Sequence, residues 1–146
     1  MNTDFKASGF WRNIKELLPG HRRMLDCVQV AVTSRCMEHC RYCPHTVFKE
    51  RWQQRDMPMA TFERLWPILQ RAERVHLQGW GEPLLNSNFF NIAALSRKAG
   101  CTVSTTTCGM GLREKQAAAL VEAELDIVAP DRHRCREQCC THRRSI

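Results

Sequence analysis

The sequence contains no apolar run long enough to cross a membrane, and its first residues lack the apolar stretch of a secretory signal. We therefore expect a cytoplasmic protein without a membrane partner. In that reducing compartment, nine cysteines do not favour a disulfide framework. They indicate metal binding or redox chemistry instead.

A basic stripe of the kind that binds nucleic acid is also missing. The formal net charge is +7, but residues 130–146 carry five arginines against Asp131 and Glu137, which leaves only +4 on residues 1–129. We do not expect nucleic-acid binding, although a tRNA or another anionic substrate stays open.

The apolar pattern alternates between short strands and longer helices, and the 146 residues suit one domain or part of a larger one. Strands are predicted at 28–33, 75–78, 101–107 and 125–129. Helices are predicted at 9–18, 88–99 and 112–123, and around 62–69, where Pro67 introduces a kink. Residues 44–60 read as irregular. This order predicts an α/β fold with a parallel sheet of right-handed βαβ units.

Three unusual stretches follow predicted strands. They are CMEHCRYC at 36–43, GWGEP at 79–83 and TTTCG at 105–109. Because reactive groups collect at the carboxyl ends of parallel strands, we expect these stretches to form one site.

The first stretch places three cysteines, Cys36, Cys40 and Cys43, within eight positions and has no fourth. Iron–sulfur clusters are held by cysteine thiolates, normally four of them. Three thiolates would leave one iron of a 4Fe–4S cluster open, which a catalytic site needs and a structural site lacks.

The C-x3-C-x2-C spacing after a first strand resembles the signature of radical S-adenosylmethionine (radical SAM) enzymes. GWGEP resembles their G-G-E-P turn, with Trp80 in place of a glycine, and TTTCG resembles T-x-T-N-G, with Cys108 in place of asparagine. The likeness runs from about residue 24 to residue 129. It implies a partial (β/α)6 barrel of about three and a half βα units. The expected domains are a helical extension at 1–26, a truncated core at 27–129 and an irregular tail at 130–146.

The resemblance also implies cofactors and roles. The three cysteines would hold a 4Fe–4S cluster, and S-adenosylmethionine (AdoMet) would be cleaved to a 5′-deoxyadenosyl radical that abstracts hydrogen. A small electron donor of the ferredoxin or flavodoxin type would supply the electron, and the substrate would be a peptide or a cofactor precursor. The residues implied in AdoMet binding are Tyr42, Trp80, Gly81, Glu82, Pro83, Thr105 and Thr107.

Two other interpretations stay open. The three cysteines, with His39 or His45, would also suit a structural zinc site in a module without enzymatic activity. The threonines at 105–107 are also good strand formers without any role in binding. An inactive remnant is the second alternative to an active enzyme, beside the zinc module.

Residues 130–146 lose all apolar periodicity and contain three cysteines and five arginines. They would form a second metal site or result from a frameshift or truncation, and we favour the latter because the pattern stops at once. An unpaired fourth strand is an aggregation hazard. We therefore expect the isolated chain to fold poorly or to bind AdoMet weakly.

Overall fold

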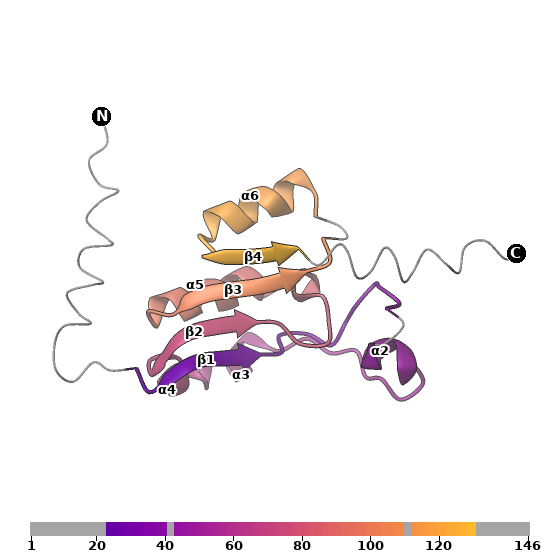
Figure 1. Ribbon diagram of the computed structural model, residues 1–146, viewed down its shortest axis with the longest axis horizontal. Coiled ribbons are helices and arrows are strands. Elements are labelled where there is room, and N and C mark those ends of the chain that lie inside the picture. The colour runs from indigo at the N-terminus through magenta and orange to yellow at the C-terminus, as the bar shows by residue number, and fades with distance from the viewer. Residues whose placement is uncertain (1–22, 41–42, 110–111, 131–146) are drawn as a thin grey trace, which may run out of the picture.

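A computed structural model describes residues 23–40, 43–109 and 112–130 (Figure 1). Three predictions lie outside these ranges: the helix at 9–18, the position of Tyr42, and nearly all of the tail at 130–146. They stay predictions.

The described residues form a four-stranded parallel sheet in the order β1-β2-β3-β4 (Figure 1). The strands are β1 (Leu25–Val30), β2 (Ala72–Leu77), β3 (Thr102–Thr107) and β4 (Ile127–Pro130). Neighbouring strands pair in register with Val28 opposite Val75, Val75 opposite Val103, and Thr105 opposite Val128. This confirms the predicted α/β class and the parallel sheet.

The first strand begins and ends three residues earlier than the predicted 28–33. The reason lies in its partner. Residues 31–35, which we call the exit segment, leave β2 and pair instead with residues 53–57, which we call the facing segment. The Met57 N–H donates to the Val32 carbonyl at 2.8 Å, and the Ser34 N–H donates to the Arg55 carbonyl at 2.9 Å. Apolar patterning predicts an extended chain here but not which segment it pairs with.

The helices follow the predicted order with shifted boundaries. They are α2 (Pro44–Val47), α3 (Met59–Glu63), α4 (Trp66–Leu69), the 3-10 turn η1 (Pro83–Leu85), α5 (Phe89–Lys98) and α6 (Glu114–Glu122). The prediction that residues 44–60 are irregular is wrong at α2 and at the start of α3. Pro67 lies in the first turn of α4 and lacks an N–H to continue α3, so the predicted kinked helix is two short helices. Among the described residues, no helix is long and apolar enough to cross a membrane.

The core lies between one face of the sheet and the helices packed on it (Figure 1). Side chains alternate along β3, where Val103, Thr105 and Thr107 are buried and the residues between them are partly exposed. The apolar core residues are Val30, Val32, Phe62, Leu69, Ala72, Val75, Leu77, Phe89, Ile92, Ala93, Cys101, Val103 and Leu120. Burial of this face fixes the register of the strands, and therefore the relative positions of the loops at their ends.

The opposite face of the sheet is polar and more exposed. His76 contacts the Ser104 hydroxyl through Nδ1 at 2.9 Å and the Gln78 side-chain oxygen through Nε2 at 2.7 Å. Both of its ring nitrogens therefore have partners, so His76 is a satisfied strand residue.

Candidate functional site

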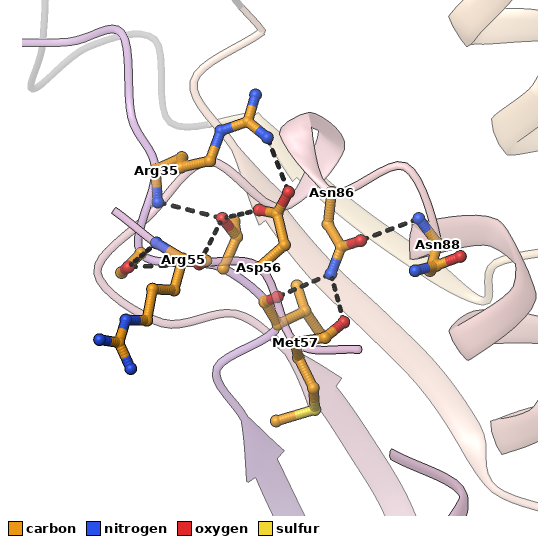
Figure 2. Close-up of polar contacts among 9 residues, drawn as sticks. Arg35, Arg55, Asp56, Met57, Asn86 and Asn88 are labelled. Atoms are coloured by element: carbon orange, nitrogen blue, oxygen red, sulfur yellow. Dashed lines mark hydrogen bonds and ion pairs between the residues drawn. The ribbon is translucent and has the colours of Figure 1, made fainter. Parts of the chain in front are cut away.

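The exit segment is held rigidly where it leads into the cysteine loop (Figure 2). The buried Thr33 hydroxyl donates to Asp56 Oδ1 at 2.6 Å and accepts the Arg35 N–H at 3.0 Å. The Arg35 guanidinium forms an ion pair with Asp56 Oδ2 at 2.6 Å. Trp52 donates its indole N–H to the Ser34 carbonyl at 2.8 Å. These contacts fix the start of the loop that carries the three cysteines.

Asn86 joins the two segments to the helix layer (Figure 2). Its side chain is 2% exposed, and Nδ2 donates to the Val32 carbonyl at 2.7 Å and to the Met57 carbonyl at 3.2 Å. Its Oδ1 accepts the Asn88 N–H at 2.8 Å, directly before α5. One amide thereby bonds three backbone groups, including the Val32 carbonyl that also accepts the Met57 N–H, and links both segments to the start of α5.

The GWGEP turn lies directly against the exit segment. A Cβ at Gly81 would lie 2.5 Å from the Thr33 carbonyl oxygen and 2.6 Å from that of Arg35. A Cβ at Gly79 would lie 2.4 Å from the Ala31 Cβ. The Glu82 N–H donates to the Arg35 carbonyl at 2.8 Å. The glycines are required by this close backbone approach, which brings the turn to the cysteine loop.

Glu82 is buried, with only 3% of its surface exposed, and its carboxylate joins the ends of β2 and β3. Oε1 accepts the Thr107 hydroxyl at 2.6 Å and the Leu84 N–H at 3.3 Å, while Oε2 accepts the Cys108 N–H at 2.8 Å. A buried carboxylate is tolerated because these donors replace water. Glu82 therefore links the GWGEP turn to the TTTCG stretch through hydrogen bonds of its carboxylate.

The three thiols lie on one loop next to this turn. Cys36, Cys40 and Cys43 are partly buried thiols, and the Cys43 sulfur lies 4.0 Å from the Trp80 carbonyl oxygen. The Glu38 N–H points at the Cys36 sulfur at 3.4 Å. Within the described ranges, no three His, Cys, Asp or Glu side chains converge as a ready-made metal site. The loop supplies the thiols, and it would have to draw them together around a metal.

The pKa of the Cys36 thiol reflects its burial and its charged neighbours. Burial raises the pKa of the Cys36 thiol above its usual value, and the Glu38 N–H works in the opposite direction. The negative charges of Glu82, Cys40 and Cys43 raise that pKa further. Three neighbouring thiolates repel one another and are stable together only beside a cation, which is what a metal provides. The donor set thus fits an iron–sulfur cluster held by three cysteines.

Comparison with known proteins decides the family, because the Radical SAM superfamily model matches residues 30–144. The chain belongs to the Radical SAM superfamily. The match includes residues 131–144. Whether this tail forms a second metal site or results from a frameshift or truncation stays a prediction.

Two known proteins are similar to this chain over part of their length. A GTP 3',8-cyclase from Campylobacter fetus subsp. fetus (strain 82-40) is 31% identical over 117 residues, covering 75% of this chain and 35% of that protein. The crystal structure of BtrN in complex with AdoMet and 2-DOIA has a TM-score of 0.59 and 27% identity, covering 68% of this chain and 42% of BtrN. Selenomethionine BtrN in an open conformation has a TM-score of 0.58 at the same identity. The radical SAM chain described here therefore spans about a third of the cyclase and less than half of BtrN.

The structure brings most of the predicted site residues together but gives two of them a different surrounding. The Thr105 hydroxyl donates to the Leu77 carbonyl at 2.8 Å, and Thr107 is bonded to Glu82. Both hydroxyls already have partners, Thr105 within the sheet and Thr107 in the turn after β2, which favours the interpretation of these threonines as strand formers. Contact of Thr105, Thr107 or Tyr42 with AdoMet stays a prediction.

The residues that sequence reasoning missed are those that hold the exit segment. Thr33, Asp56 and Asn86 carry no motif, and the segment that contains Asp56 read as irregular. Together with Trp80, the exit and facing segments also line a cavity of about 290 Å³, whose wall includes Trp52. These roles become visible only when it is known which backbone segments lie next to each other. A single sequence does not show which segments those are.

Proposed function

We propose that this chain carries the cofactor-binding half of a radical SAM enzyme, with Cys36, Cys40 and Cys43 holding a 4Fe–4S cluster beside bound AdoMet. The cluster, when bound, supplies the electron that cleaves AdoMet to methionine and a 5′-deoxyadenosyl radical for hydrogen abstraction. One observation carries the proposal: the thiol loop and the Gly-Glu-Pro turn adjoin, with Cys43 next to the Trp80 carbonyl and the Glu82 N–H bonded to Arg35.

The residues of the chain have separable tasks in this proposal. Carbonyl groups of the 80–83 turn would accept hydrogen bonds from the ammonium group of AdoMet, and the nearby Glu82 carboxylate would favour that positive charge. Trp80, which is 62% exposed, provides an apolar surface that excludes water from one side of the site. Tyr42 would contact the adenine. The clamp of Thr33, Arg35 and Asp56 keeps the thiol loop and the turn at a fixed separation.

The substrate is expected to be a cofactor precursor or a peptide, modified in the cytoplasm with electrons from a ferredoxin- or flavodoxin-type donor. The names of the two relatives favour a small molecule, because one is a cyclase of GTP and the other was crystallised with 2-DOIA. The chain spans less than half of either relative, so the residues that would select the substrate are expected in the part that it does not match.

Anaerobic reconstitution with iron and sulfide tests the proposal. The chain should turn brown and bind about four irons. With a strong reductant and AdoMet in excess it should release 5′-deoxyadenosine, at a low rate because the isolated chain is expected to bind AdoMet weakly. The Cys36→Ser, Cys40→Ser and Cys43→Ser variants should lose both properties. Cys27→Ser is the matched control, because Cys27 is exposed and lies within β1, before the site. A colourless chain that retains one zinc instead would refute the proposal and support a structural zinc site.

A further inference from the structure

Two buried polar groups next to the cysteine loop have no hydrogen-bond partner. They are His45 Nδ1 and Thr46 Oγ1, neighbours in α2. The His45 side chain is buried, with 7% of its surface exposed. Nearly all buried polar groups in proteins are hydrogen-bonded, so each exception calls for an explanation such as an unseen water or ion. Two such exceptions side by side leave room for either a water or a bound group to supply the missing partners.

The position of α2 ties both groups to the cysteines. The helix begins directly after Cys43, whose carbonyl accepts the Thr46 N–H at 2.9 Å and the Val47 N–H at 3.0 Å. The Cys43 N–H in turn donates to the Cys40 carbonyl at 3.0 Å. Cys43 therefore directly precedes the helical turn that carries the two orphaned atoms.

The imidazole of His45 is fixed by two ring contacts. It forms T-shaped contacts with the Trp52 ring at a centroid distance of 5.9 Å and with the His39 ring at 6.5 Å. Trp52 is itself anchored to the exit segment, and His39 lies between Cys36 and Cys40. The ring is thus packed between the clamp and the cysteine loop, where no described acceptor meets Nδ1.

We propose that His45, through an N–H at Nδ1, and Thr46, through its hydroxyl, donate hydrogen bonds to the sulfur-rich group that the three cysteines hold. The inference rests on the proposed function, since it needs that group to be a cluster. Hydrogen bonds to cluster sulfurs stabilise the reduced, more negative state and so raise the reduction potential. His45 would therefore tune how readily the cluster accepts an electron.

The test is an EPR-monitored redox titration of the reconstituted chain. A hydrogen bond to a charged acceptor changes an equilibrium constant by about tenfold or more, so His45→Phe should lower the potential by about 59 mV for one electron. Phe keeps the ring contacts with Trp52 and His39. His45→Asn places an amide nitrogen near the Nδ1 position and should restore the potential to within about 10 mV, whereas His45→Gln, with its nitrogen near Nε2, should not.

Thr46→Val should lower the potential in the same direction, and Thr46→Ser, which keeps the hydroxyl, should not. His76→Phe is the distant control, because both nitrogens of His76 already have partners. The melting temperature of the apo chain gives a second readout. Replacing an orphaned polar group by an apolar one of similar shape leaves the apo chain equally stable or more stable. A histidine with a purely structural role would lower that temperature.

The outcomes separate the two proposals. If the unmodified chain takes up no cluster, the proposed function fails and this inference fails with it. If the cluster forms normally but His45→Phe leaves the potential unchanged, or Asn and Gln behave alike, only the inference is overturned.

Discussion

Replacing Glu82 by alanine should cost the apo protein a large part of its stability. The carboxylate accepts the Thr107 hydroxyl at 2.6 Å and the Cys108 N–H at 2.8 Å, with a longer bond of 3.3 Å from the Leu84 N–H. Hydrogen bonds to charged groups contribute about 1.5–3 kcal/mol each, and a buried donor left without a partner is equally unfavourable. Counting the two short bonds, Glu82→Ala should lower the free energy of unfolding by about 3–6 kcal/mol.

Glu82→Gln distinguishes hydrogen bonding from packing. The amide keeps one acceptor for the Cys108 N–H, but its NH2 group faces the Thr107 hydroxyl, which already accepts the Gly109 N–H at 3.0 Å. We expect a smaller loss of about 1–2 kcal/mol, because one hydrogen bond has to be rearranged.

Urea denaturation followed by far-UV circular dichroism measures both losses, with Glu63→Ala as the matched control. Glu63 is an exposed glutamate in α3, and its replacement should change stability by less than about 0.5 kcal/mol. If Glu82→Ala is as stable as Glu63→Ala, the carboxylate does not hold the ends of β2 and β3 together, and this part of the reasoning is refuted.

Three further predictions concern the same region. Gly81→Ala should lower stability by about 1–3 kcal/mol, because the new Cβ would lie against two carbonyl oxygens of the exit segment; an unchanged melting temperature would contradict this contact. Asn86→Asp should cost about 2–3 kcal/mol by urea denaturation, because a carboxylate cannot donate to the two carbonyls that Asn86 now satisfies; equal stability would refute the bridge. Because burial raises the pKa of the folded Cys36 thiol, the unfolded thiol loses its proton first, so the apo chain should lose stability as the pH rises from about 8 to about 10. Cys36→Ser should weaken that pH dependence of the melting temperature, and an unaltered profile would count against it.

Much of the fold could be predicted from apolar periodicity alone. The β3 strand and α5 were predicted to within one residue of their ends, since alternation along β3 and the Gly100 stop after α5 are local signals. The boundaries failed at β1, where Val32 pairs with Met57 of the facing segment rather than with β2. Which partner an extended segment chooses depends on the tertiary fold, and a single sequence does not reveal it.

The candidate site shows the same division. Motif spacing brought the cysteine loop, the Gly-Glu-Pro turn and the end of β3 to one edge of the sheet, as the structure confirms for their described residues. The motif did not predict that Glu82 would be buried and hydrogen-bonded to Thr107, nor that Asn86 would hold the exit segment. These roles depend on where the carbonyl and hydroxyl groups of distant residues meet, and composition and spacing contain no signal of that.

Mössbauer spectroscopy of the chain reconstituted with 57Fe tests the central claim most directly. If three cysteines hold a 4Fe–4S cluster and leave one iron without a protein ligand, adding AdoMet should change the spectrum of one iron in about four, with the other three unaltered. A cluster whose irons all stay unchanged when AdoMet is added, or a chain that takes up no iron under these conditions, would contradict the account.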